Sequence, residues 1–308
     1  MKMIFIFLDG FGIGEPNSDK NPVYRANTPA FDFILKNGKM MATDACLEVP
    51  GLPQSATGQT AIFTGVNASK VLGRHLHGQP TVTLKKLINQ NNLFMELIRR
   101  GLKVTNTNAY RSEYLNKMFD PNEKKCRPSV TTVMTLASGL NLRTMEEYKL
   151  GNGVYHDITG KILVDTGYVE ATISPEEAAQ RLFNISREYD FTMFEHFMTD
   201  IIGHKMDMTE AVSEIELIDR FLGELLKLVN LDHLGEQSSD NNSASLEDYV
   251  IFITSDHGNI EDATVKTHTF NKVPTVILGR ADEISSVKVE SLLDVMPAIL
   301  NLFDSCNH

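Results

Sequence analysis

Short, unbroken runs of apolar residues, separated by stretches with helical spacing, constrain the fold of this chain most strongly. Residues 3–8 form one such run, and 249–254 form another. Runs at 101–105, 189–194 and 273–278 also have the length and composition of strands. Strands that are apolar on both faces are typical of a parallel sheet covered by helices on each side. The sequence therefore predicts an α/β fold.

The helices are predicted between these strands. Residues 84–100 carry Leu and Ile at helical spacing, and 209–229 form the strongest amphipathic helix. A closing helix is expected over 289–303, with Pro297 as a candidate kink. A polar stretch at 237–243 is predicted to be a surface loop.

The length of 308 residues allows one large domain or two small ones, on a prior of roughly 150 residues per domain. Residues 112–173 have weaker periodicity and many polar side chains. This stretch is either a small inserted lobe over the site, or a set of loops and edge elements.

Composition excludes several classes of protein. With 42% hydrophobic and 22% charged residues, the chain is neither disordered nor fibrous. A net charge of −11, with no long run of Lys and Arg, argues against nucleic acid as a partner. Cys46, Cys126 and Cys306 have no CxxC spacing and are expected to be reduced thiols of a cytoplasmic protein. The apolar run at 3–8 is too short for a signal peptide or a membrane span.

Polar residues with the chemistry of metal ligands follow several predicted strands. Each has a simple structural explanation alone: a turn, a helix cap or a solvated loop. Together they suit two cations with oxygen and nitrogen ligands, because ligands bind beyond the carboxyl ends of parallel strands. Two such cations can hold the attacking and leaving oxygens of a displacement at phosphorus. The residues are Asp9, Ser55, Asp200, His204, Asp256, His257 and His268.

The motifs that contain these residues resemble, in their order, those of the alkaline phosphatase superfamily. They are most similar to its branch of cofactor-independent phosphoglycerate mutase and phosphopentomutase. The matching segments are Asp9-Gly10, residues 55–59, 200–204, 256–259, His268-Thr269, Val273-Pro274 and 293–300. The resemblance implies a three-layer α/β/α sandwich with a mainly parallel sheet, formed as a single catalytic domain over residues 1–308.

The resemblance also implies roles for these residues. One metal site would use Asp200, His204 and His268, and the other would use Asp9, Asp256, His257 and the Ser55 oxygen. The ions would be Mn²⁺ or Zn²⁺. Ser55 would be the nucleophile that attacks a small-molecule phosphate ester and becomes a phosphoserine.

Two features depart from the family pattern. Gln59 replaces the usual His of the nucleophile motif, and the chain is much shorter than the bacterial mutases. A mutase must hold its organic group while phosphate is returned to it, so a small insert favours a phosphatase or phosphodiesterase over a phosphomutase. A metal-binding module without turnover, and an α/β domain without metal, are the alternatives from other classes.

Candidate substrate contacts are Arg74, Asn108 and Arg111. Arg74 follows the nucleophile motif, and the other two follow a predicted strand. His156-Asp157 is a further polar pair in the 112–173 stretch. Solvated loop residues are the alternative interpretation for all of them.

Overall fold

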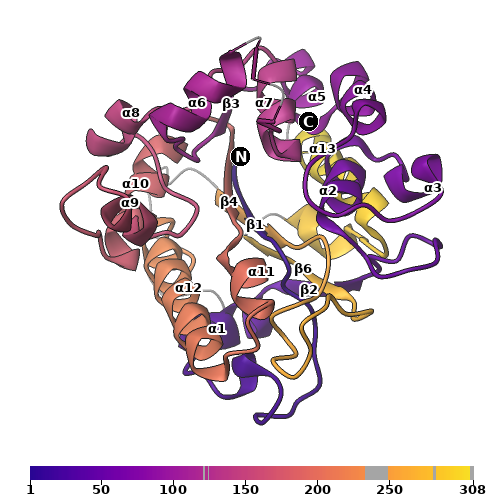
Figure 1. Cartoon of the computed structure of the whole chain (residues 1–308). Coiled ribbons are helices and arrows are strands. Elements are labelled where there is room, and N and C mark those ends of the chain that lie inside the picture. Colours follow the sequence, from indigo (N-terminus) through magenta and orange to yellow (C-terminus); the bar gives the residue numbers. More distant parts are fainter. Residues whose placement is uncertain (121, 124, 233–248, 280–281, 306–308) are drawn as a thin grey trace.

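The computed structural model describes residues 1–120, 122–123, 125–232, 249–279 and 282–305, and its centre is one six-stranded sheet (Figure 1). The strand order is β2-β6-β5-β1-β4-β3. Strand β6 is antiparallel to both of its neighbours, and the remaining pairs are parallel. The strands are β1 (Lys2–Leu8), β2 (Lys39–Thr43), β3 (Val104–Asn106), β4 (Phe191–His196), β5 (Tyr249–Thr254) and β6 (Val273–Gly279). The expected α/β fold with a mainly parallel sheet is confirmed.

Strand β1 lies in the middle of the sheet and contributes to two cores. Met3, Phe5 and Phe7 belong to the core on one face, while Ile4, Ile6 and Leu8 belong to the core on the other. Because successive side chains point to opposite faces, a strand buried on both sides is apolar at every position. This explains the unbroken run at the start of the sequence.

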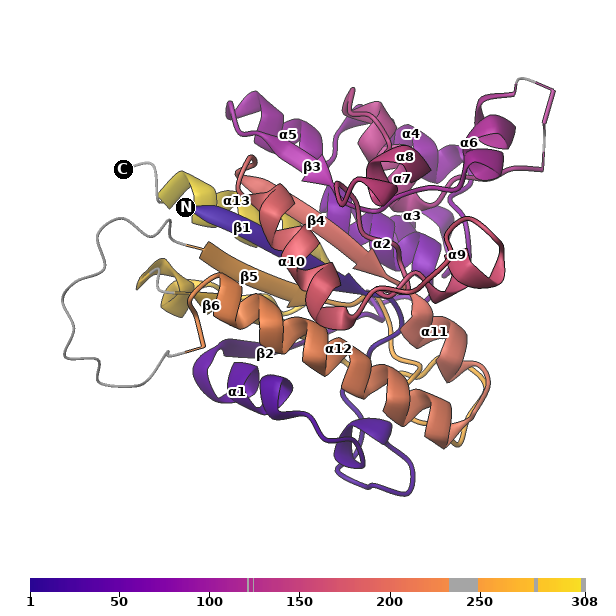
Figure 2. The same ribbon diagram turned by 90° about the vertical axis from the view of Figure 1, so that its left-hand side faces the viewer.

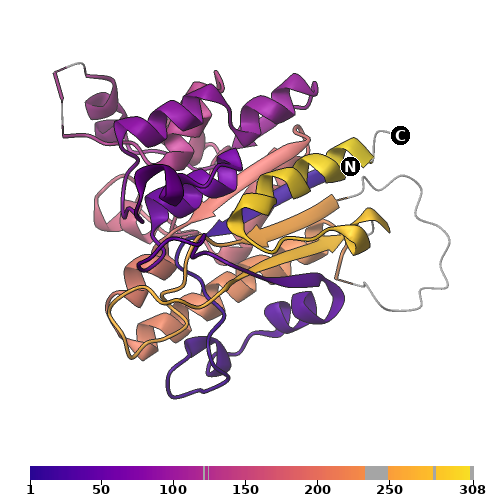
Figure 3. The same ribbon diagram turned by 90° about the vertical axis from the view of Figure 1, so that its right-hand side faces the viewer.

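Helices cover both faces of the sheet and complete the three layers (Figures 2 and 3). One face packs against α1 (Pro29–Asn37), α10 (Pro175–Ser186) and α12 (Met208–Leu228). The other packs against α2 (Ser55–Thr64), α4 (Val82–Gln90), α5 (Leu93–Arg99), α7 (Val130–Ala137) and α13 (Val295–Ser305). The shorter elements are η1 (Pro22–Tyr24), α3 (Ala68–Leu72), α6 (Ser112–Phe119), α8 (Met145–Lys149), α9 (Lys161–Asp165), α11 (Met198–Gly203), η2 (Asp282–Ser286) and η3 (Leu292–Asp294).

Two predicted helices were wrong in extent. The single helix expected over 84–100 is divided into α4 and α5, because Asn91 is extended and Asn92 caps α5 by accepting the Met95 N–H at 3.0 Å. The closing helix begins at Val295 rather than at residue 289. Pro297 therefore lies in its first turn, where no intrahelical N–H is needed, and produces no kink there.

Two predicted strands are shifted toward their carboxyl ends. The run at 101–105 yields only Val104–Asn106, and the run at 189–194 yields Phe191–His196. The second shift places Glu195 and His196 inside a buried strand. The loop predicted at 237–243 lies outside the described residues.

Residues 112–173 divide between the helical layer over the sheet and a small core of their own. Helix α7 belongs to the layer over the sheet, whereas Met145, Tyr148, Tyr155 and Leu163 form a small separate core with Ala109. Isolated bridges join Asn108 to Val154 and Ala109 to Arg143, next to the end of β3. This stretch thus builds a wall beside the carboxyl edge of the sheet.

Two further expectations concern the cysteines and the membrane. Cys46 and Cys126 are free thiols, and Cys306 lies outside the described residues. Within the part of the chain that the structure describes, every helix is too short or too polar to cross a bilayer.

Candidate active site

The carboxyl ends of three neighbouring strands bring the predicted ligands together. Asp9 follows β1, Asp256 and His257 follow β5, and Asp200 lies in α11, just after β4. Strand β1 pairs with both β4 and β5, so these segments share one edge of the sheet. Gly10 has a φ of 70° and an added Cβ there would lie 2.9 Å from the Asp200 Cα. Only glycine allows this turn and this close approach.

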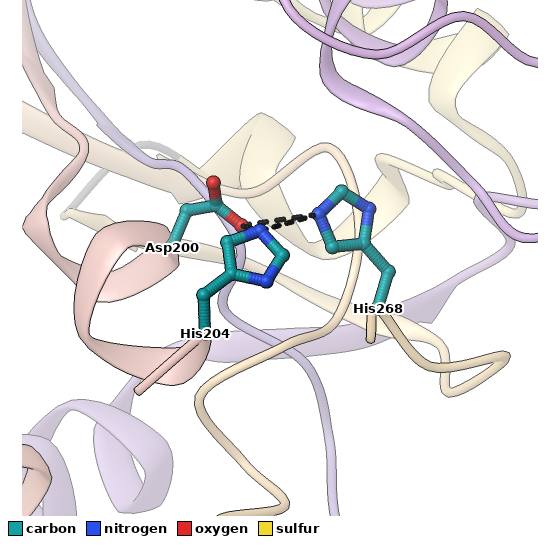
Figure 4. A group of neighbouring side chains, drawn as sticks. All are labelled: Asp200, His204 and His268. Carbon is teal, nitrogen blue, oxygen red and sulfur yellow. Dashed lines mark hydrogen bonds and ion pairs between the residues drawn. The ribbon is translucent and has the colours of Figure 1, made fainter. Parts of the chain in front are cut away.

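Asp200, His204 and His268 form the first candidate metal group (Figure 4). Asp200 and His204 are four residues apart at α11, and therefore face the same side. The Nε2 atoms of His268 and His204 lie 3.2 Å and 3.4 Å from the Asp200 Oδ1. The two Nε2 atoms are 3.3 Å apart. All three potential ligand atoms thus point at one place.

Backbone carbonyls fix the orientation of both imidazoles in this group. The His204 Nδ1 donates to the Lys266 oxygen and the His268 Nδ1 donates to the Pro53 oxygen, each at 2.8 Å. A carbonyl can only accept, so Nδ1 carries the proton and a neutral ring presents its Nε2 lone pair. Two lone pairs and a carboxylate oxygen that face one another fit a cation.

Asp9, Asp256 and His257 form the second candidate metal group, and all three are buried. The His257 Nε2 lies 3.2 Å from the Asp9 Oδ1 and 3.7 Å from the Asp256 Oδ2. The Asp9 Oδ1 is buried and faces the His257 ring, but it accepts no well-formed hydrogen bond from any described residue. A buried carboxylate oxygen without a donor is costly, and a cation would satisfy it.

Gln59 connects the two carboxylates of the second group. Its Nε2 donates to the Asp9 Oδ2 at 3.1 Å and to the Asp256 Oδ2 at 3.2 Å. Gln59 is itself buried in α2. The amide therefore occupies one oxygen of each carboxylate and leaves the Asp9 Oδ1 facing His257.

The ionisation of these groups shows how strongly the cluster attracts positive charge. Burial and the nearby Asp256 carboxylate raise the pKa of Asp9 well above its usual value. Although burial alone lowers the pKa of His257, Asp256 and Asp9 raise it to about 10. Burial also opposes ionisation of Asp200, but hydrogen bonding to His268 and the charge of His257 lower its pKa overall. In the protein without metal, the positive charge of protonated His257 offsets part of the negative charge of the carboxylates.

Ser55 lies beside the second group, in the cleft that the first group also lines. It is the first residue of α2, whose N-cap is Gln54, so its side chain is not the helix cap. Its Oγ lies 3.0 Å from the His257 Nε2, and the His257 ring stacks on that of His268 with centroids 3.7 Å apart. The hydroxyl therefore faces the second group and lies near the first, at the positive end of a helix.

A cleft of about 600 Å³ opens over these residues. Asp9, Ser55, Asp200, His204 and His268 line its wall. Gln59 and Glu195 line the same cleft. These five of the seven predicted residues come from four separate segments of the chain, whereas Asp256 and His257 lie behind the wall.

Several residues around this cleft were missed by sequence reasoning. The Asn259 Nδ2 donates to the Asp200 Oδ1 at 2.7 Å and so orients that carboxylate. Glu195 is buried, accepts a hydrogen bond from the Thr131 hydroxyl, and has its pKa raised by burial to about 7. Its signal in the sequence was a carboxylate within an otherwise apolar strand segment.

The candidate substrate contacts have different surroundings. Arg111 and Asn108 line a second cleft beside the first, whereas Arg74 lines neither of these two clefts. The Asn108 side chain also bridges to the backbone of Glu195, with its Nδ2 2.7 Å from the Glu195 oxygen. His156 lines the second cleft, while Asp157 accepts the backbone N–H groups of Gly160 and Ile162, each at 2.7 Å.

Curated relatives of this chain are phosphoglycerate mutases. The 2,3-bisphosphoglycerate-independent phosphoglycerate mutase of Desulforudis audaxviator is 31% identical over 141 residues, which cover 42% of this chain and 25% of that protein. The enzyme of the same name from Mesomycoplasma hyopneumoniae is 22% identical over 243 residues, which cover 73% of this chain and 45% of that protein. The chain thus spans less than half the length of these two relatives.

Solved structures share the fold over nearly the whole chain. The PH0037 protein from Pyrococcus horikoshii matches with a TM-score of 0.58 and 17% identity, covering 98% of this chain and 96% of that one. The alkaline phosphatase from the Antarctic bacterium TAB5 matches with a TM-score of 0.51 and 14% identity, covering 98% and 97%. These similarities establish an alkaline-phosphatase-like fold.

A family model covers almost the entire sequence. It matches residues 1–235 and 241–306, which include both candidate metal groups and Ser55. With its alkaline-phosphatase-like fold, the chain belongs to the Metalloenzyme superfamily.

Proposed function

We propose that this protein is a two-metal phosphoryl-transfer enzyme that hydrolyses a small-molecule phosphate ester through a phosphoserine at Ser55. The observation that carries the proposal is the position of the Ser55 Oγ, 3.0 Å from His257 and in the same cleft as Asp200, His204 and His268. Asp200, His204 and His268 would hold one divalent ion, and Asp9, Asp256 and His257 would hold the other with Ser55. Bound divalent ions would lower the pKa of the serine hydroxyl and offset the charge of the phosphoryl oxygens.

The residues of the chain supply the remaining steps. Helix α2 presents the Ser55 hydroxyl and its positive end to the phosphoryl group. The Ser55 Oγ forms a bond to phosphorus while the bond to the leaving oxygen breaks, and the hydroxyl proton passes through water in the cleft to the leaving oxygen, which departs as an alcohol. Water then attacks the phosphoserine, which restores Ser55 and releases inorganic phosphate. We propose Mn²⁺ or Zn²⁺, since carboxylate and imidazole suit both.

A phosphomutase is the second candidate. Its support is the match to phosphoglycerate mutases, which for one relative covers 73% of this chain. Because that match includes only 45% of the relative, most of the relative has no counterpart in this chain. Hydrolysis needs only the nucleophile and the metal ligands, so we retain it as the main proposal.

The test is turnover of phenyl phosphate by protein loaded with Mn²⁺ or with Zn²⁺. We expect turnover that a chelator abolishes, that Ser55→Ala reduces by at least about a hundredfold, and that leaves phosphate trapped on Ser55 after an acid quench. Ser213→Ala, at an exposed serine of α12, is the matched control. Bound metal without turnover or phosphoserine would instead indicate a binding module, and conversion between phosphoglycerate isomers would indicate a mutase.

A further inference from the structure

A second cleft, of about 240 Å³, lies beside the first. The two clefts share four wall residues, Gln79, Ser129, Glu195 and Phe197. They therefore adjoin at this shared wall. If the phosphoryl group of a substrate lies at Ser55, as in the proposed function, the rest of the molecule can extend into the second cleft.

Two arginines line the second cleft without a partner. Arg111 is half-buried and Arg127 is exposed. Among the described residues, neither guanidinium has a hydrogen bond or an ion pair. By contrast, the nearby Arg143 and Arg181 donate to backbone oxygens, at 3.1 Å and 3.0 Å. An unpaired, partly buried guanidinium favours an anionic ligand, because it presents donors whose charge is not offset.

The first turn of α7 adds positive potential to the same wall. Ser129, its N-cap, and Thr132 both line the cleft, and the Ser129 Oγ accepts the Thr132 N–H at 3.2 Å. The remaining N–H groups of this turn have no acceptor within the helix. Helix N-termini attract anions, so α7 and the arginines both favour an anionic ligand in this cleft.

His156 contributes a polar atom without a partner. Its ring stacks on Phe197, with centroids 3.8 Å apart, and its buried Nδ1 makes no hydrogen bond to any described residue. Burial, with His196 and Arg111 nearby, lowers the pKa of His156 to about 3. The ring is therefore neutral, and it lines the cleft without adding charge.

The carboxylates near this cleft are already engaged. Glu195 accepts the Thr131 hydroxyl, and both oxygens of Asp157 accept backbone N–H groups. Neither forms an ion pair with Arg111 or Arg127. The positive charge of the two arginines is thus available to a ligand.

We infer that the second cleft binds an anionic group on the leaving-group side of the substrate, and that Arg111 and Arg127 are its ligands. The preferred substrate is then a phosphate ester that carries a second anion, either a carboxylate or another phosphate. The inference rests on the proposed function for the position of the reacting phosphoryl group. Tyr110 and Tyr114, whose rings stack with centroids 5.8 Å apart, give the same cleft an aromatic wall for the linking atoms.

Binding of stable phosphonates tests this inference without turnover. Calorimetry on the metal-loaded protein would compare alkylphosphonates with carboxyalkyl phosphonates and alkyl bisphosphonates over a series of chain lengths. We expect the second anion to tighten binding by about tenfold at the matching length, as for a charge-assisted hydrogen bond. A larger gain with the carboxylate or with the second phosphonate identifies which anion the cleft accepts.

Arginine variants locate the effect. Arg111→Met and Arg127→Met should each remove most of the gain that the second anion provides, measured as the ratio of affinities for the doubly and singly anionic ligands in the same variant. Arg127 is exposed, so its variant is expected to fold even if Arg111→Met does not. Arg25→Met, at an exposed arginine outside both clefts, is the control.

Two results would overturn the inference. One is equal affinity for the singly and doubly anionic ligands at every length, and the other is a gain that survives both arginine variants. If phenyl phosphate were still hydrolysed in either case, only the inference would fail. Absence of both phosphonate binding and turnover would remove the proposed function as well.

Discussion

Gln59 is the residue at which this chain departs most clearly from the pattern of its family. The motif that the sequence resembles has a histidine at this position, and the structure shows that the Gln59 amide is buried and donates to Asp9 and Asp256 at 3.1 Å and 3.2 Å. A neutral donor can bridge two carboxylates without competing for a metal ion, because an amide nitrogen has no lone pair to offer. Gln59 therefore orients both carboxylates.

Replacing this amide tests its role. We expect Gln59→Leu to lower the free energy of unfolding of the metal-free protein by about 1–3 kcal/mol, since each carboxylate loses a buried donor. Urea unfolding with a chelator measures the change. Gln180→Leu is the control, because the Gln180 amide bonds only Asn184, at the surface of α10. Equal losses in the two variants would contradict the bridging role.

Glu195 gives a prediction about pH. Burial raises its pKa from 4.5 to about 7, so the folded protein holds a proton that the unfolded chain releases above about pH 4.5. The contribution of this group to stability is present below pH 4.5 and is lost as the pH rises to about 7. The size of the pKa shift sets an upper limit of about 3 kcal/mol on the contribution of Glu195 to the free energy of unfolding.

Glu195→Gln should remove this dependence, because the amide does not titrate. Urea unfolding of the metal-free protein at pH 5 and at pH 8 measures this. The free energy of unfolding of the variant should rise relative to that of the wild type at the higher pH. Glu188→Gln, at an exposed glutamate before β4, is the control. A difference between wild type and Glu195→Gln that stays constant with pH would refute the prediction.

At the scale of elements, the contact between α2 and the loop after β5 determines where the nucleophile lies. Gly58, in the first turn of α2, packs so closely that an added Cβ would lie 2.9 Å from the Asp256 oxygen and 3.0 Å from the Asp256 Cβ. This contact holds Ser55 against His257. The sequence places a glycine there, but only the packing of two distant elements explains it.

Gly58→Ala should therefore weaken metal binding at the Asp9, Asp256 and His257 group, although alanine favours a helix by about 1 kcal/mol over glycine. We expect at least about a tenfold loss in metal affinity by calorimetry, because contacts that hold the metal ligands in place typically matter to that degree. Gly223→Ala in α12 is the control, since an added Cβ meets only the Ala30 Cβ, at 3.4 Å. An unchanged metal affinity in Gly58→Ala would show that the close contact between α2 and the loop after β5 is not needed for metal binding.

At the scale of the whole molecule, the two candidate metal groups join segments from both ends of the chain. Asp9 follows the first strand, and His268 precedes the last. Three carboxylates gather at one edge of the sheet, and in the metal-free protein their charge is offset in part by protonation of His257. Bound cations would relieve this repulsion only in the folded state.

Metal should consequently stabilise the fold. With free metal about a hundredfold above its dissociation constant, each site is expected to add about 2.7 kcal/mol to the free energy of unfolding. Thermal unfolding with Mn²⁺, with Zn²⁺ and with a chelator measures the shift in melting temperature. His204→Ala should reduce the shift, whereas His75→Ala, whose ring bonds to Val49 and Ser69 away from the ligands, should not. A melting temperature that is independent of metal would contradict the assignment of both groups.

Sequence patterns were sufficient to predict the fold class and to name the seven residues that the structure brings together. Strands buried on both faces must be apolar throughout, and polar residues just beyond them fall at the edge where parallel sheets bind ligands. The break between α4 and α5, the start of α13 and the inclusion of Glu195 in β4 were not predicted, because capping and tertiary packing set element ends.

The details of the site depend on contacts between elements that are distant in the sequence and are visible only in the tertiary structure. The tautomers of His204 and His268 depend on the carbonyls of Lys266 and Pro53, and the bridge from Gln59 depends on how α2 meets two strand ends. The second cleft likewise joins Arg111 and Arg127 to a helix N-terminus across a gap in the sequence. Such contacts join residues that no local pattern relates, since they arise only when separate elements pack against one another.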